Sequence, residues 1–119
     1  MSDSKKEVAK VLSRSEILEA QDMSNRLIEV PEWGGSVYVG MMRGHERDAF
    51  ELAMAGGAKN IRAKLVADVC QDSEGKRLFT DADVELLGEK SAKALQRVYN
   101  VAVRMNGFTD RDIDTLEKN

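Results

Sequence analysis

The chain has 119 residues, of which 42% are hydrophobic and 33% are charged, and its formal net charge is −3. These values are typical of one globular domain with a modest core. Charges of both signs are interspersed, which argues against a broad nucleic-acid surface. One cysteine excludes an internal disulfide and a multi-cysteine metal site, and it fits a reducing compartment. We expect neither a signal peptide nor a membrane-spanning segment.

We expect residues 1–12 to be a flexible N-terminal segment and residues 13–119 to form a single helical domain. Ser13 and Glu16 have the spacing of a capping box, and Leu12 and Ile17 flank them at the positions of a hydrophobic staple. The pattern predicts a short helix from about residue 14 to residue 21.

The next segment, at about 27–42, changes to a period of two and predicts a β-hairpin. Its alternation places one set of side chains on one face: Ile28, Val30, Val37 and Val39. The other face then carries Leu27, Glu29, Tyr38 and Gly40. Pro31 cannot donate a ladder hydrogen bond, so a two-residue turn and a wider loop from Glu32 to Gly35 both remain open. A hairpin is marginal alone, so it must pack on helices, add strands or pair with another chain.

Two helices are predicted in the middle of the chain. The first runs from Gly44 to about Ala55 and ends at a pair of glycines. The second runs from about Ala58 to Val69 with apolar residues at helical spacing. A turn at 72–75 follows, and the short segments 69–71 and 77–79 are expected to pair across it as a second hairpin.

The C-terminal part repeats the capping pattern. Thr80 with Asp83, and Thr109 with Asp112, predict two further helix starts. Between them, the segment from Glu89 to Met105 is apolar over much of its girth, which predicts a long central helix. The predicted fold is therefore mainly α within the α+β class: a compact helical domain of about five to six helices with an N-terminal β-hairpin.

Residue types that carry chemistry are few. His45 has no convergent partners in the sequence, and Cys70 follows an apolar helix, so we interpret them as a surface residue and a structural thiol. Asp110, Asp112 and Asp114 lack the glycine of a calcium loop. We therefore predict no catalytic residue, no cofactor site and no metal site, and we do not expect an enzyme.

Trp33 is the only tryptophan and lies at the expected hairpin tip. It either folds back over the core or anchors a partner, because tryptophan is enriched where binding energy concentrates. Tyr38 extends such a patch. We predict a partner-binding surface of Trp33, Tyr38, Met41 and Met42, and the six methionines suggest an adaptable surface for an apolar helix.

Three runs of sequence, in this order and spacing, carry a family resemblance. They are Val30-Pro31-Glu32-Trp33-Gly34-Gly35, Gly44-His45-Glu46-Arg47-Asp48-Ala49-Phe50-Glu51, and Gly75-Lys76-Arg77-Leu78-Phe79-Thr80-Asp81 leading to Leu87-Gly88-Glu89-Lys90-Ser91-Ala92. Together they resemble the tail assembly chaperones of long-tailed, siphovirus-like bacteriophages. The resemblance covers roughly residues 12–119, and none of the runs is a catalytic signature.

The resemblance implies a non-enzymatic function in the cytoplasm of the infected host. Such chaperones bind the tape-measure protein and keep it soluble until tail-tube subunits polymerise around it, and they are absent from the mature virion. A longer form made by frameshifting is thought to recruit the tube protein. Self-association is expected, with no nucleic-acid or membrane partner.

Two alternatives remain beside this resemblance. One is a structural or tail-completion component retained in the virion. The other is a small DNA-binding regulator, which the acidic balance disfavours.

Overall fold

A computed structural model describes residues 10–118 of the chain. The elements are, in order, α1 (Arg14–Glu19), β1 (Asn25–Val30), the 3-10 turn η1 (Pro31–Trp33), β2 (Gly35–Gly40), α2 (Gly44–Ala55), α3 (Ile61–Val69), β3 (Cys70–Gln71), the 3-10 turn η2 (Asp81–Asp83), α4 (Val84–Gly88), α5 (Ala92–Met105) and α6 (Asp110–Lys118). The described residues thus form six α-helices and one three-stranded antiparallel sheet. The mainly α fold with an N-terminal hairpin is confirmed.

The sheet has the strand order β1-β2-β3. Val30 pairs with Gly35 and Ile28 with Val37, so the hairpin closes through the wider loop, one residue earlier than the expected bounds. Val30 and Val39 are fully buried while Leu27 is more than half exposed, which confirms the predicted faces.

The third strand was not predicted as part of this sheet. Val39 of β2 pairs with Cys70 at the end of α3, and the expected second hairpin is reduced to a bridge between Gln71 and Arg77. Gly40 permits this arrangement, because a Cβ there would collide with the side chain of Gln71. The Gln71 side chain instead reaches β1, where it accepts a hydrogen bond from Asn25 at 3.4 Å.

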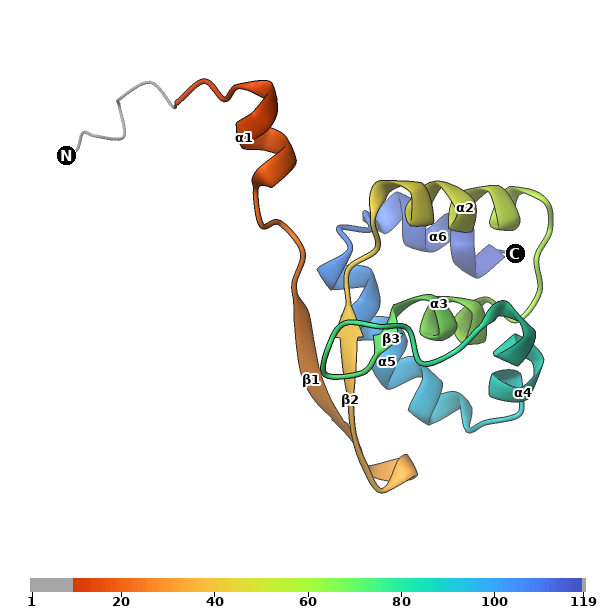
Figure 1. Cartoon of the computed structure of the whole chain (residues 1–119). Helices are drawn as coiled ribbons and strands as arrows, with labels where there is room; N and C mark the ends of the chain where they lie inside the picture. Colours follow the sequence, from red (N-terminus) through yellow and green to blue (C-terminus); the bar gives the residue numbers. More distant parts are fainter. Residues whose placement is uncertain (1–9, 119) are drawn as a thin grey trace.

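Helix α5 is the centre of the core, as predicted from its broad apolar face. It packs against α3 on one side and against β1, β2 and η1 on another (Figure 1). Its buried side chains are Ala94, Leu95, Val98, Tyr99, Ala102 and Val103.

Two predicted helix starts were too early. Helix α5 begins at Ala92, three residues after Glu89, because Ser91 accepts hydrogen bonds from the N–H groups of Lys93 and Ala94 and so caps the helix. Helix α3 begins at Ile61, since Asn60 adopts a left-handed conformation with φ 58° that interrupts the helix.

Asn106 connects three elements at the end of α5. Its side-chain oxygen accepts the N–H of Met42 at 2.7 Å, and its side-chain nitrogen donates to the carbonyls of Gly40 and Ala102. This amide fixes the position at which the chain leaves β2 and enters α2.

The α2–α6 contact completes the body of the protein. The Phe50 and Phe108 rings meet edge to face with centroids 6.0 Å apart, and the guanidinium of Arg47 lies 3.9 Å from the Phe108 ring centre. Arg47 also pairs with Glu51 and Asp112. Leu116 of α6 is buried, so the last helix closes one side of the core.

Helix α1 stands apart from this body (Figure 1). The predicted capping box is present: Ser13 N–H donates to Glu16 Oε1 at 2.9 Å, and Glu16 N–H donates to Ser13 Oγ at 3.2 Å. The helix ends at Glu19, two residues before the expected bound, and buries none of its residues. Residues 10–24 are called the arm below. Most of the flexible segment predicted for 1–12 lies outside the described residues.

Candidate partner-binding surface

The hairpin tip is held rigidly against α5. Proline at the first position of η1 fixes its backbone, and Gly34 ends the turn with φ 74°, in the left-handed region that favours glycine. Glu32 accepts a hydrogen bond from Arg97 Nε at 2.8 Å. This hydrogen bond is the main reason that the pKa of Glu32 is lowered, so its carboxylate stays ionised at neutral pH. The tip is therefore preorganised.

A groove lies beside this tip, and we call it the tip groove. It has a volume of about 470 Å³ and is lined by Glu32, Trp33, Phe79, Leu87 and Lys90. Trp33 and Phe79 are half-buried and pack on the core, whereas Leu87 is buried. The groove thus has an apolar floor and one charge of each sign at its rim. Such a surface suits the apolar face of an amphipathic helix.

The sequence left two interpretations of Trp33 open. Its packing confirms that it covers the core, and its role as a partner anchor stays a prediction. The ring covers the core, and its remaining exposed part lines the tip groove. An aromatic side chain that is already held in place loses little conformational freedom on binding. Trp33 is therefore well suited to anchor a partner.

The other three predicted site residues lie elsewhere. Tyr38 is half-buried on the outer face of the sheet, paired with Leu27 and Gln71. Met41 is half-buried and its sulfur accepts a hydrogen bond from Ser24. Met42 is a core residue, 9% exposed, because the chain crosses here to the end of α5. The four residues do not form one continuous surface.

The methionines do not form the adaptable surface suggested by their number. Met42 and Met54 are buried, and Met41 and Met105 are half-buried. Within residues 10–118 only Met23 of the arm counts as exposed.

Sequence reasoning missed Phe79 and Leu87 as site residues. It assigned both to the scaffold, as a staple residue and as part of a helix. They reach the tip groove because α4 packs on α3 and the hairpin tip packs on α5. No local spacing encodes this long-range contact, although the apolar character of Phe79 next to a helix cap was a usable signal.

A second apolar groove lies between α2 and α6. It has a volume of about 450 Å³ and includes Phe50, Met54, Phe108 and Leu116. Arg47, Glu51 and Asp112 form ion pairs along its rim. Of its two aromatic rings Phe50 is buried, whereas both rings of the tip groove, Trp33 and Phe79, are partly exposed, so the tip groove is the stronger candidate.

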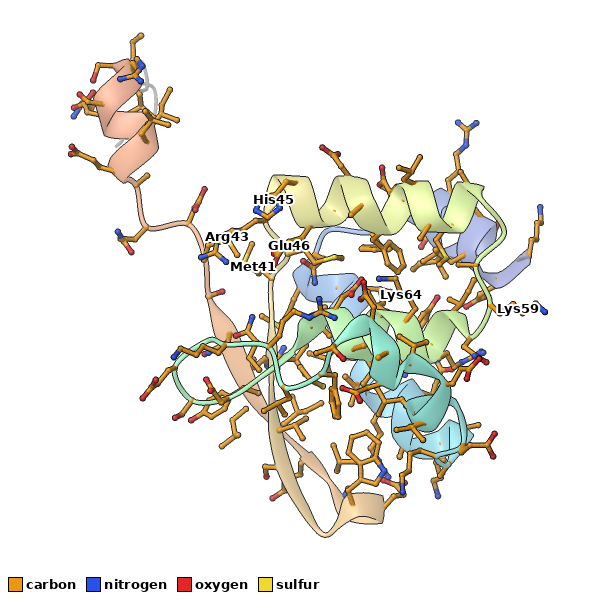
Figure 2. All side chains as sticks on the ribbon, turned by 45° about the vertical axis from the view of Figure 1, so that its right-hand side comes forward. Met41, Arg43, His45, Glu46, Lys59 and Lys64 are labelled. Carbon is orange, nitrogen blue, oxygen red and sulfur yellow. The ribbon has the colours of Figure 1, made fainter. Side chains whose placement is uncertain are left out.

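The residues considered for chemistry occupy the expected positions. His45 is exposed at the start of α2 (Figure 2). Cys70 is buried, and burial raises the pKa of its thiol to about 12, so it is protonated at neutral pH. Asp112 accepts the N–H of Thr109 as a helix cap.

Residues 10–118 contain no group of three His, Cys, Asp or Glu side chains placed to hold a metal ion. No helix in this range has the length and apolar character needed to cross a membrane.

Comparison with known proteins gives one informative result. No family model and no characterised protein sequence matches the chain. Among solved structures, the tail assembly chaperone of bacteriophage HK97 matches with a TM-score of 0.60 over 81% of this chain and 95% of that chain, at 18% sequence identity. At this identity the match shows a shared fold. The resemblance drawn from the sequence is therefore confirmed at the level of the fold.

Proposed function

We propose that this protein is a bacteriophage tail assembly chaperone that binds helical segments of a tape-measure protein through the tip groove. Binding keeps the tape-measure protein soluble while tail-tube subunits polymerise around it. The protein acts in the cytoplasm of the infected host and is absent from the finished virion. The shared fold supports a function in tail assembly, and the tip groove supports the mode of binding.

The chemistry of the groove selects this type of partner. A tape-measure protein is long and helical, so its unassembled helices expose apolar stripes that need cover. One such stripe can pack against the apolar side chains of the groove, which are Trp33, Phe79 and Leu87. Glu32 and Lys90 can pair with charges of either sign that flank the stripe. Many weak sites of this kind, occupied by several chaperone copies, would cover one long partner.

Two further partners belong to this proposal. The outer edge of β1 is unpaired within the described sheet, so it offers backbone groups for contact between chaperone copies. A longer form of the protein would add a segment that recruits the tail-tube protein.

The only tryptophan of the chain provides a direct test. We expect purified chaperone, titrated with tryptophan-free tape-measure fragments, to show a saturable blue shift of Trp33 fluorescence as the groove loses water. Trp33→Ala should weaken the complex by about tenfold or more, since buried aromatic anchors often contribute more than 2 kcal/mol. Leu52→Ala is the matched control, because Leu52 is 75% exposed on α2, outside the lining of the tip groove.

Folding of each variant is checked by circular dichroism, since Trp33 also covers part of the core. Lys90→Glu is a second variant that changes only the exposed rim and should alter the salt dependence of binding. If folded chaperone forms no complex with any fragment, the proposal is wrong. If a complex forms without a change in Trp33 fluorescence, the tip groove is excluded as its site. Detection of the protein in purified virions by mass spectrometry would instead favour a structural tail component.

A further inference from the structure

A second feature lies away from the tip groove, where α3 begins and α6 ends. It is a cleft of about 410 Å³, lined by Asn60, Ile61, Arg62, Tyr99, Leu116 and Glu117. None of these residues lines the tip groove. Three features of the cleft supply hydrogen-bond donors.

The first donor is the hydroxyl of Tyr99. The residue is only 2% exposed, yet its oxygen has no hydrogen-bond partner within the described residues. Burial, followed by the negative charge of Glu117, raises the pKa of Tyr99, so the hydroxyl keeps its proton. Buried polar atoms are nearly always paired, so an unpaired hydroxyl at a cleft indicates a missing partner.

The second donor is the N-terminus of α3. This nine-residue helix has Asn60 at its N-cap position, but the Asn60 side chain caps no N–H group. Its left-handed backbone turns the amide toward Gly88, where a Cβ would lie 3.3 Å from Asn60 Cγ. The first N–H groups of α3, and the positive end of its dipole, are left free for another acceptor.

The third donor is the guanidinium of Arg62, which lies 5.7 Å from the centre of the Tyr99 ring. Its Nε donates to Gln96, and this contact holds the group beside the cleft. Glu117, exposed in the last turn of α6, is the opposing charge.

We propose that this cleft binds the side-chain carboxylate of a glutamate from a protein partner. A carboxylate accepts several hydrogen bonds, which matches the Tyr99 hydroxyl, the free α3 N–H groups and Arg62. Ile61 and Leu116 line the same cleft and suit the two methylene groups of a glutamate. Glu117 repels a doubly charged phosphate more strongly than a singly charged carboxylate. The cleft therefore adds a specific polar contact to a protein whose tip groove has an apolar floor.

The test uses a small probe and the full-length protein. N-acetyl-glutamate N-methylamide is titrated into isotope-labelled protein, and the amide signals of residues 61–63 are followed by NMR. We expect saturable shifts with this probe and none with the matched glutamine derivative, which carries no charge. Tyr99→Phe and Arg62→Gln should each weaken binding by about fivefold. Arg104→Gln removes an exposed charge from α5 and serves as the matched control.

Two further measurements separate this proposal from its alternatives. Tyr99→Phe should keep the wild-type melting temperature, because the lost hydroxyl has no partner in the free protein. Glu117→Gln should strengthen binding of the glutamate probe by removing like-charge repulsion. Equal shifts with the glutamine probe, tighter binding of inorganic phosphate, or unchanged affinity in folded Tyr99→Phe would each overturn the proposal. None of these results depends on the tape-measure protein, so the tip groove is tested separately.

Discussion

The first and last helices within residues 10–118 begin in the same way but lie in different surroundings. Ser13 with Glu16 and Thr109 with Asp112 form the same pair of cap hydrogen bonds, all between 2.9 and 3.2 Å. Yet no residue of α1 is buried, whereas Leu116 of α6 is buried and closes one side of the core. A cap determines where a helix starts, and burial determines whether the helix joins the body.

The flanking hydrophobic residues show what makes the difference. Leu12 and Ile17, the staple positions at α1, are 52% and 56% exposed. Phe108 and Ile113, the equivalent pair at α6, pack against the core. Phe108 also meets Phe50 and the Arg47 guanidinium, neither of which lies near it in the sequence. A staple that gains such distant partners becomes part of the tertiary structure.

The largest expected contrast is in thiol reactivity. We predict that Cys70 reacts slowly with iodoacetamide at pH 8, because a pKa raised from 9.0 to about 12 lowers its thiolate fraction by roughly a thousandfold. A cysteine in the arm, introduced as Leu18→Cys at a position 67% exposed, should react at the rate of a free thiol. Mass spectrometry of timed samples measures both rates. Similar rates at the two positions would show that the core opens as readily as the arm.

The next contrast concerns the residue before each cap. Phe108→Ala should lower the free energy of unfolding by about 2–3 kcal/mol, since it removes a ring packed on the core. Leu12→Ala should change it by no more than about 0.5 kcal/mol, because its side chain is exposed. Urea denaturation followed by circular dichroism measures both. A comparable loss in the two variants would mean that the arm contributes to the body.

The caps themselves should differ by a smaller amount. Thr109→Ala is expected to cost about 1 kcal/mol in global unfolding, a typical value for a lost N-cap. Ser13→Ala should leave global unfolding unchanged and lower only the helicity of the arm. NMR secondary shifts of residues 14–19 report that local change. An altered urea midpoint in Ser13→Ala would contradict the separation of arm and body.

The smallest expected effect is in how the stability of the fold changes at acid pH. Hydrogen bonds from the backbone and side chain of Thr109 lower the pKa of Asp112 below its usual 3.8. The ionised carboxylate therefore stabilises the fold above that value, and this contribution is lost as the pH falls through the lowered pKa. We expect Asp112→Asn to flatten the acid side of the stability curve, whereas Glu16→Gln leaves it unchanged. Urea midpoints measured between pH 5 and pH 2.5, in steps of roughly half a pH unit, test this expectation.

Local patterns predicted most of the secondary structure. The period of two in Ile28, Val30, Val37 and Val39 gave the correct faces of the hairpin, because alternation alone decides which side chains meet the core. The broad apolar face of α5 correctly predicted its central position. Gly56 and Gly107 marked real helix ends, and the starts at Ser13 and Thr109 were correct. Thr80 opens the 3-10 turn η2 instead, and α4 begins only at Val84.

The errors arose where distant residues decide the structure. The pairing of Cys70 with Val39 involves only a two-residue strand, which has no detectable period. The start of α3 depends on Asn60, whose left-handed backbone no pattern specifies. For the candidate site, Trp33 was correctly singled out, but its neighbours Phe79 and Leu87 come from a segment some 50 residues away. Whether the tip groove binds a partner stays a prediction.

The arm also has a mechanical consequence. It continues from the Asn25 end of β1, the end opposite the hairpin tip (Figure 1). Asn25 pairs with Gly40, so the arm and the connection from β2 to α2 leave the hairpin at the same end. Tension on the arm therefore loads the Asn25–Gly40 pair first, and the hydrogen bonds between β1 and β2 open one after another from that end toward the hairpin tip. The pair nearest the tip, Val30 with Gly35, opens last, so the turn that carries Trp33 keeps its support longest.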